Sequence, residues 1–322
     1  MNNLNELINS VVKNYSLAVK DVVPINDTYK IITNDNQVYI LKKVKNRGVY
    51  NIYYFLLSQK FTNFIMPLLT VNNHLFMMHE NDAYYLTRYY EDIDYPLDKK
   101  LMDYIDLLHK LHKKTIIKKH FDKDQFNRLY KKKLKRLESR FQLLDLFIVE
   151  CENKKYRSLF DWTYLTKYNE ILYIKNILMR LQSQIETLLE ELKLYDYCII
   201  HNNPSIDHFV VTNEQNYLIS FDYSTIGFKV HDYVKLFIDY SEYNIDWLNL
   251  ITIDEVSSFE FYYFIFNVLY YVLRNIDITF LSKNNQYESI NSLVHSLHVA
   301  EKAIDLYQKY EEMKLAAESG NQ

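Results

Sequence analysis

One stretch near the middle of the chain constrains its fold more than any other. Within residues 198–222 an apolar run ends at His201, a second apolar run begins at Phe209, and a third ends at Ser220. Short apolar runs separated by polar turn residues predict a strand, an exposed loop and then a short hairpin. The hairpin would return the chain to the loop, so the polar residues of both would lie together.

Phosphoryl-transfer enzymes of the protein-kinase type build their active site in this way. Their loop reads His-x-Asp-x-x-x-x-Asn, where the Asp positions the attacking hydroxyl and the Asn binds metal, and an Asp after the hairpin holds Mg²⁺. Here His201 matches, but Asn203, His208 and Ser220 occupy the three chemical positions. Asn203 cannot accept a proton at neutral pH, and Ser220 brings no charge to a cation that prefers carboxylate oxygen. The sequence therefore predicts the scaffold of this site without its usual chemistry.

A lysine that could reach nucleotide phosphates lies earlier in the chain. A hairpin is predicted over residues 29–44, and the alternation of its second strand places Lys42 on the side of three apolar residues. A solvated strand end is the alternative, because Lys43 and Lys45 are adjacent. The helix expected at 49–60 has no acid to pair with Lys42, and no glycine precedes the hairpin to let the backbone approach phosphates.

Two further strands are predicted at about 74–79 and 84–89, and most of the remaining chain is predicted to be helical. Helices are expected over 2–14, 97–113, 124–150, 160–193 and much of 245–313. His109 and His112 have a spacing that could bind metal, but a third ligand is missing and a structural role is favoured. Asp232 could cap a helix or hold the shape of the 201–208 loop by hydrogen bonds.

Residues 113–140 form a basic segment, with 12 Lys and Arg against 3 Asp and Glu. Such a run could bind an anionic partner, although a solvated helix face is the more frequent explanation. Aromatic residues are sparse in it, and the net charge of the whole chain is −3, so nucleic acid is an unlikely ligand.

Composition places the chain among ordinary globular proteins, with 48% apolar and 25% charged residues. Two cysteines, Cys151 and Cys198, give no disulfide framework and fit a reducing compartment. The N-terminus lacks a signal pattern, and the most apolar run, 261–273, is too short to span a bilayer. We expect cytoplasmic synthesis and no membrane partner.

These motifs resemble the aminoglycoside/choline phosphotransferase-like superfamily, and within it the CotS-type spore coat proteins of endospore-forming Firmicutes. The resemblance rests on the 39–44 strand with Lys42, the strand 85–87, the helix ending at 108–112, and the block 198–236. It covers about residues 25–240 in order. Only four motif residues carry over unchanged, namely Lys42, His201, Asp222 and Asp232.

The resemblance implies an α+β, protein-kinase-like fold of two lobes. A small antiparallel β lobe would occupy residues 1–90, a mainly helical lobe 91–315, and a disordered tail 316–322. Lys42 and Asp222 would face the nucleotide cleft, while His201 and Asp232 would support the loop. We expect no intact catalytic residue, no metal site and no cofactor.

The expected function is that of a catalytically degenerate kinase-fold protein, a pseudokinase. It would serve as a structural or interaction component with protein partners, such as those of a spore coat. The alternative is an atypical small-molecule kinase that uses ATP and Mg²⁺, with Asp222 on the metal and Asp207 as base. Asp207 is four residues beyond the base position, so that role needs a rearranged loop.

Overall fold

The computed structural model describes residues 2–46, 48–253, 256–278 and 286–319. The chain forms two compact units: unit 1 contains residues 1–116 and 198–227, and unit 2 contains residues 117–197 and 228–322. The predicted α+β class is confirmed. The units divide the chain differently from the predicted lobes, since the 198–227 segment belongs to unit 1 with the N-terminal strands.

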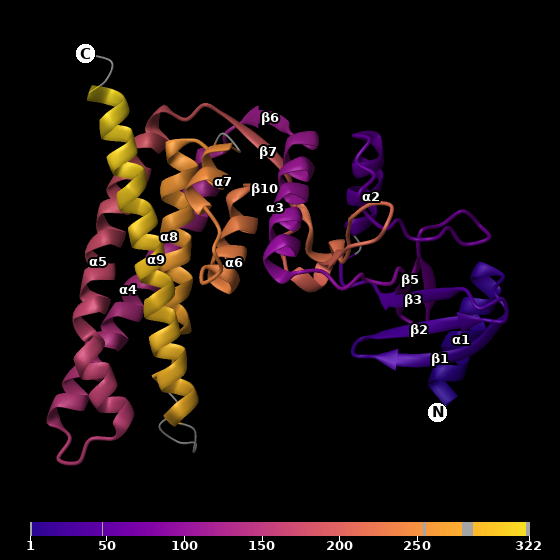
Figure 1. Cartoon of the computed structure of the whole chain (residues 1–322), viewed down its shortest axis with the longest axis horizontal. Helices are drawn as coiled ribbons and strands as arrows, with labels where there is room; N and C mark the ends of the chain where they lie inside the picture. The colour runs from indigo at the N-terminus through magenta and orange to yellow at the C-terminus, as the bar shows by residue number, and fades with distance from the viewer. Residues whose placement is uncertain (1, 47, 254–255, 279–285, 320–322) are drawn as a thin grey trace. The chain divides into compact units, whose positions relative to one another are not determined.

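Unit 1 is built on a five-stranded antiparallel sheet with the order β1-β2-β3-β5-β4 (Figure 1). Its strands are β1 (Val19–Ile25), β2 (Thr28–Thr33), β3 (Val38–Lys43), β4 (Met77–His79) and β5 (Asp82–Arg88). The helix α1 (Asn2–Tyr15) packs Leu7 and Val11 against Ile31, Leu41 and Leu86 of the sheet. The apolar face predicted for residues 2–14 therefore forms one side of a small core.

The remaining elements of unit 1 surround the 201–208 loop. They are α2 (Val49–Ser58), α3 (Leu97–Lys114), the end of β7 (Leu194–Ile200), the one-turn helices η1 (Ile206–His208) and η2 (Phe221–Tyr223), and the short strands β8 (Phe209–Val210), β9 (Tyr217–Leu218) and β10 (Thr225–Gly227). β8 pairs with β9 in a hairpin, and β10 pairs with residues 198–200 of β7. The predicted order of strand, loop and hairpin is thus present.

Unit 2 is mainly helical. It contains β6 (Ile117–His120), α4 (Lys123–Asn153), α5 (Leu159–Glu191), α6 (Val230–Tyr240), α7 (Trp247–Ile253), α8 (Ser258–Asn275) and α9 (Gln286–Ser319). α5, α8 and α9 pack on one another, and α4 packs on α5 and α8 (Figure 1). Capping boxes at Ser158 and Ser257 fix the starts of α5 and α8, because each serine and the acid three residues later satisfy backbone N–H groups.

α8 shows why a polar residue interrupts the most apolar run of the sequence. Asn267 is fully buried, and its side-chain amide donates to the carbonyl of Tyr263 one turn earlier. Its Oδ1 accepts a hydrogen bond from Lys133 of α4, so the amide links two helices inside unit 2. No helix in the described part of the chain is long and apolar enough to cross a membrane.

The C-terminal tail differs from the expectation. Residues 316–319 are helical as the last turn of α9, rather than disordered, while residues 320–322 lie outside the described residues. The stretch consists largely of Ala and Glu, both strong helix formers, so α9 continues through it.

Candidate functional site

Two neighbouring strands carry the first half of the candidate site. Lys42 on β3 lies directly opposite Tyr85 on β5 in the antiparallel register. Directly opposed residues of paired strands project from the same face of a sheet. The pairing therefore aims the Lys42 ammonium and the Tyr85 hydroxyl in a common direction. Leu41, the residue before Lys42, is buried on the other face of the sheet in the core with α1.

Both side chains meet Asp222, which is 1% exposed. The Lys42 Nζ lies 2.5 Å from Asp222 Oδ2, and the Tyr85 hydroxyl donates to the same oxygen at 3.2 Å. Lys42 also donates to Ser220 Oγ at 3.1 Å. We call Lys42, Tyr85, Ser220 and Asp222 the lysine–aspartate site; it lies wholly within unit 1.

The backbone of Ser220 lets the 219–222 segment turn toward Lys42. Its φ of 66° and ψ of 48° place it in the left-handed region, which is uncommon for a residue other than glycine, asparagine or aspartate. The next residue, Phe221, packs on Tyr53, Phe64 and His201. This aromatic contact holds the strained turn in place, because unfolding the turn would expose Phe221.

The electrostatics of the site favour its ion pair. Burial raises the pKa of the Tyr85 phenol well above its ordinary value, and the nearby Tyr53 and Asp222 raise it further. Burial raises the pKa of Tyr53 in the same way. Both phenols are therefore neutral at physiological pH, so Tyr85 is a hydrogen-bond donor to the carboxylate. The buried Asp222 thus has a cation and a neutral donor as partners.

The 201–208 loop is held by hydrogen bonds to the segment that carries Asp222. His201 is fully buried, and its Nε2 donates to the Ile219 carbonyl at 2.8 Å. Ser224 Oγ of the segment donates to the His201 carbonyl at 3.2 Å. Asn202 Nδ2 of the loop donates to the Tyr223 carbonyl at 3.0 Å. Three hydrogen bonds therefore hold the loop to the 219–224 segment.

A second anchor ties the loop and β7 to α3. The Ser205 amide donates to the Tyr104 hydroxyl at 3.1 Å. The Ile199 amide donates to Thr115 Oγ1 at 3.0 Å, and Thr115 is fully buried at the end of α3. Tyr104 and Thr115 are not part of the kinase-like loop motif. The position of the loop therefore depends on α3 in addition to the segment that carries Asp222.

His208, at the position of the metal-binding Asn, is a neutral base in this structure. Its Nδ1 donates to the Asn203 carbonyl at 2.9 Å. Burial lowers the pKa of the His208 imidazole to about 4, and the neighbouring His201 and Lys42 lower it further. Its ring centroid lies 5.3 Å from that of His201. His208 thus offers an imidazole nitrogen where the motif has an amide oxygen.

The other predicted residues are placed as follows. Asn203 is half-buried, and its backbone carbonyl is occupied by His208. Asp207, the alternative base, is exposed, and its amide donates to Ser205 Oγ at 3.4 Å. Asp232 is fully buried in the first turn of α6, in unit 2, so its role in supporting the loop stays a prediction.

A magnesium site requires oxygen ligands, chiefly carboxylates. The three motif positions supply an amide, an imidazole and a hydroxyl, and Asp222 already accepts from Lys42 and Tyr85. No three His, Cys, Asp or Glu side chains gather in a metal-binding arrangement anywhere among the residues that the structure describes. The site therefore does not fit the metal that the kinase pattern implies.

Tyr85 is the member of the site that sequence reasoning missed. Residues 84–89 read as a strand, but the sequence does not give the register that puts Tyr85 opposite Lys42. Tyr104 and Thr115 were missed for a related reason, because Tyr104 lies on the amphipathic face of α3 and Thr115 directly follows that helix. A tyrosine or threonine among leucines carries no local signal that its hydroxyl will meet a distant amide.

Comparison with known proteins supports the fold. No protein-family model and no curated protein sequence matches the chain. Among solved structures, an aminoglycoside phosphotransferase from Alicyclobacillus acidocaldarius is similar with a TM-score of 0.71 and 15% identity, over 95% of this chain and 96% of that one. A spectinomycin phosphotransferase in complex with ADP and spectinomycin has a TM-score of 0.60 and 12% identity, over 94% and 98%.

The chain therefore has a protein-kinase-like fold, with an antiparallel β-sheet N-lobe and a helical C-lobe, as the sequence motifs predicted. At 12–15% identity these likenesses show the fold alone. Whether the chain is active depends on the site itself, because one fold can carry many functions or none.

Proposed function

We propose that this protein is a catalytically degenerate member of the kinase-like fold, in which the lysine–aspartate site is a structural link rather than a phosphoryl-transfer centre. The observation that carries the proposal is the 2.5 Å ion pair between Lys42 and Asp222. In the kinase pattern the lysine contacts phosphates and an acid near Asp222 holds Mg²⁺. Here the lysine and the remaining acid are paired with each other.

The burial of the pair supports this interpretation. The Asp222 side chain is 2% exposed and that of Lys42 is 19% exposed. Leaving a carboxylate so buried without its cation costs free energy. If the pair were broken, a phosphate would have to replace Asp222 beside Lys42, and a metal ion would have to replace Lys42 beside Asp222. Ser220 and His208, in the two other metal positions, bring no anionic oxygen there.

A protein that keeps the kinase-like fold without phosphoryl transfer would function by binding partners at its surface. We therefore infer a structural or interaction role with protein partners, and the resemblance to CotS-type proteins makes a spore coat the first assembly to test. The atypical-kinase alternative would need Asp207 as base and Asp222 on the metal. Asp207 is exposed and Asp222 is engaged, so neither placement favours it.

Calorimetric titration of ATP with and without Mg²⁺ tests the proposal. We expect that Mg²⁺ does not tighten ATP binding to the wild-type protein, and that Ser220→Asp, which restores a carboxylate beside Lys42, increases the effect of Mg²⁺. Tighter ATP binding by wild type in Mg²⁺, removed by Asp222→Asn and retained in Lys43→Met, would favour the atypical kinase. Lys43 is a matched control because it neighbours Lys42 and pairs with the exposed Asp82.

A further inference from the structure

A hollow between α4 and α8 in unit 2 has a marked charge. Its volume is about 590 Å³, within the range of small-molecule sites. Its described lining residues are Lys132, Lys135, Arg136, Leu137, Ser139, Arg140, Leu143, Tyr270 and Arg274. Five of these nine are cationic and none is acidic.

The α4 side of the hollow is one continuous stripe. The lining positions 132, 135, 136, 139, 140 and 143 follow the three- and four-residue spacing that places side chains on one helix face. They extend over about three turns, or roughly 16 Å at 1.5 Å per residue. Lys131, also in the basic segment, is not among the lining residues.

Arg140 is fixed at the centre of the lining. Its Nε donates to the Leu273 carbonyl at 3.0 Å, and its Nη2 donates to the Ile276 carbonyl. These carbonyls belong to the end of α8, where unpaired carbonyls would otherwise present negative charge. Burial lowers the pKa of Arg140, whereas the charge of Asp277 raises it. With Arg274 in the same turn, this end of α8 presents positive charge to the hollow.

The floor of the hollow is apolar. Leu137 and Tyr270 are 7% and 4% exposed, so their side chains are already packed and preformed. The Lys133 ammonium lies 5.8 Å from the centre of the Tyr270 ring, which adds a further cation close to the floor. Around this floor Lys132, Lys135 and Arg136 are exposed and free to close on a ligand.

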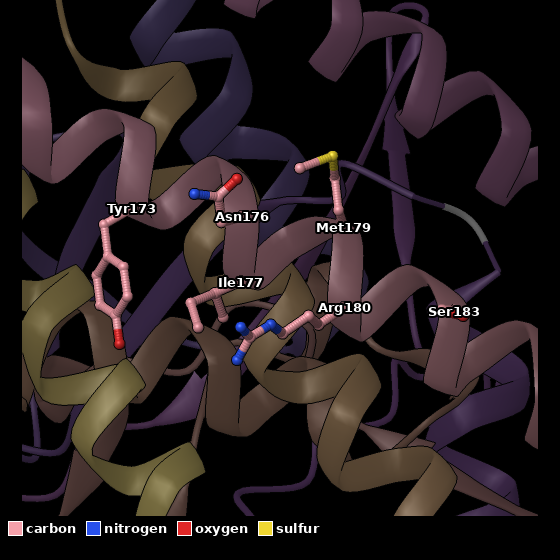
Figure 2. Close-up of a pocket in the computed structure, with 6 residues that line it drawn as sticks. All are labelled: Tyr173, Asn176, Ile177, Met179, Arg180 and Ser183. Carbon is pink, nitrogen blue, oxygen red and sulfur yellow. The ribbon is translucent and has the colours of Figure 1, made fainter.

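A second hollow on the neighbouring helix shows that these features are not general to the surface. Its volume is about 430 Å³, and its six labelled lining residues all belong to α5 (Figure 2). Arg180 is the one cation among the side chains drawn there, next to Asn176 and Met179. The α4–α8 hollow differs in having two walls, an apolar floor and clustered cations.

We propose that the α4–α8 hollow binds a small molecule that carries two or more phosphate groups. Guanidinium groups match phosphate oxygens in a planar, two-point geometry, and several cations around one hollow suit an anion with several charges. The volume suits a compact ligand, and Tyr270 and Leu137 offer an apolar contact to its remainder. The inference is independent of the lysine–aspartate site, which lies in unit 1.

Calorimetric titration with sodium tripolyphosphate, without divalent cations and at 150 mM salt, tests this site. The double variant Arg136→Gln/Arg274→Gln removes two exposed charges from the hollow. The control Lys119→Gln/Lys131→Gln removes two exposed charges from elsewhere in the basic segment. We expect the hollow variant to bind at least about tenfold more weakly, since each charge-assisted hydrogen bond is worth about a factor of ten. The control should bind like wild type.

Three outcomes would overturn the proposal. Equal weakening in both variants would mean diffuse attraction to the basic segment. Absence of tripolyphosphate binding to wild type would mean that no small polyphosphate site exists. Retention on heparin or on anionic vesicles, with no tripolyphosphate binding, would assign the segment to a long polyanion or a lipid surface. Circular dichroism of both variants confirms that the comparison is between folded proteins.

Discussion

At the scale of single residues, the ion pair of Lys42 with Asp222 determines how the site is interpreted. It joins β3 to the η2 turn, two segments 180 residues apart in the chain. Because Asp222 is almost wholly buried, its carboxylate depends on Lys42 and Tyr85 for compensation. Under the proposed function, this acid contributes to the stability of unit 1 rather than to catalysis.

Removing either partner should therefore destabilise the protein. We expect Lys42→Met to lower the free energy of unfolding by about 3–5 kcal/mol, because it leaves a buried carboxylate without its cation. Asp222→Asn should cost less, since the Lys42 ammonium is 19% exposed and can reach water. Urea unfolding of both single variants and of the double variant gives the coupling energy.

The neighbouring Lys43 supplies the control for this cycle. Its ion pair with Asp82 has a Nζ–Oδ2 distance of 2.6 Å, similar to that of Lys42, but its side chain is 52% exposed. Solvent screens such a pair, so Lys43→Met should unfold with wild type. If Lys42→Met also unfolds with wild type, the lysine–aspartate site is not a structural link.

Two histidines should make the stability depend on pH. Burial lowers the pKa values of His208 and His231 to about 4, whereas an unfolded histidine has a pKa of about 6.5. Between these values the unfolded state binds more protons, so the free energy of unfolding should fall as the pH decreases from about 6.5 to 4. Chemical denaturation between pH 7 and 5 measures this slope.

His208→Asn should make that slope shallower. The asparagine amide can still donate to the Asn203 carbonyl, but it does not titrate. The variant should therefore keep its stability at low pH better than wild type does. An identical slope in wild type and variant would mean that His208 is accessible to protons in the folded state.

Part of this site could be predicted from the sequence. The structure brings together Lys42, Ser220 and Asp222, which strand alternation and motif spacing had singled out. Tyr85 could not be predicted, because its role follows from the register between β3 and β5. The protonation state of His208 follows from burial among neighbours, which a spacing pattern does not specify.

At the scale of elements, the junction of α3 with β7 positions the loop. Thr115 ends α3, and its hydroxyl donates to the Leu111 carbonyl at 2.8 Å while accepting from the Ile199 amide at 3.0 Å. One buried hydroxyl thus forms hydrogen bonds with a backbone carbonyl at the end of α3 and with a backbone amide of β7. The strand then enters the loop two residues later, at His201.

Thr115→Val should test this junction. The change keeps the branched shape of the side chain but leaves the buried Ile199 amide without its acceptor, at an expected cost of about 1–3 kcal/mol. Hydrogen exchange at Ile199 should become faster. Thr163→Val on α5 is the matched control, since the half-buried Thr163 makes the same bond to a carbonyl four residues earlier.

For the control we expect a change within about 0.5 kcal/mol. Equal loss of stability in the two valine variants would mean that only the bond within the helix matters, and that the α3–β7 contact contributes little.

Most of the long helices were predictable, but not every strand was. Periodic apolar residues indicated α3, α4 and α5 to within a few residues, because their faces are amphipathic and capping residues begin α4 and α5. α8 was covered only by the broad helical region expected over 245–313. β6 escaped prediction, since its four residues include two lysines and a histidine. It becomes a strand by pairing with β7, a contact that no local pattern reveals.

At the scale of the whole molecule, the kinase-like fold is present while the chemical positions of its motif carry other residues. The chain matches an aminoglycoside phosphotransferase over 95% of its length with 15% identity, yet three chemical positions of the motif are Asn203, His208 and Ser220. The contacts that hold the loop to the segment carrying Asp222 are hydrogen bonds within the protein. Selection for shape alone would preserve such contacts.

The most direct test is transfer of the γ-phosphate of ATP in the presence of Mg²⁺. Acceptors should include water, an aminoglycoside, spectinomycin, choline and a protein substrate. A positioned base alone contributes about 10²–10⁴-fold to such a rate, and the metal positions are altered as well. We predict that release or transfer of phosphate stays at the level of a reaction without the protein. Mg²⁺-dependent turnover that is lost in Asp222→Asn and kept in Lys43→Met would contradict the account.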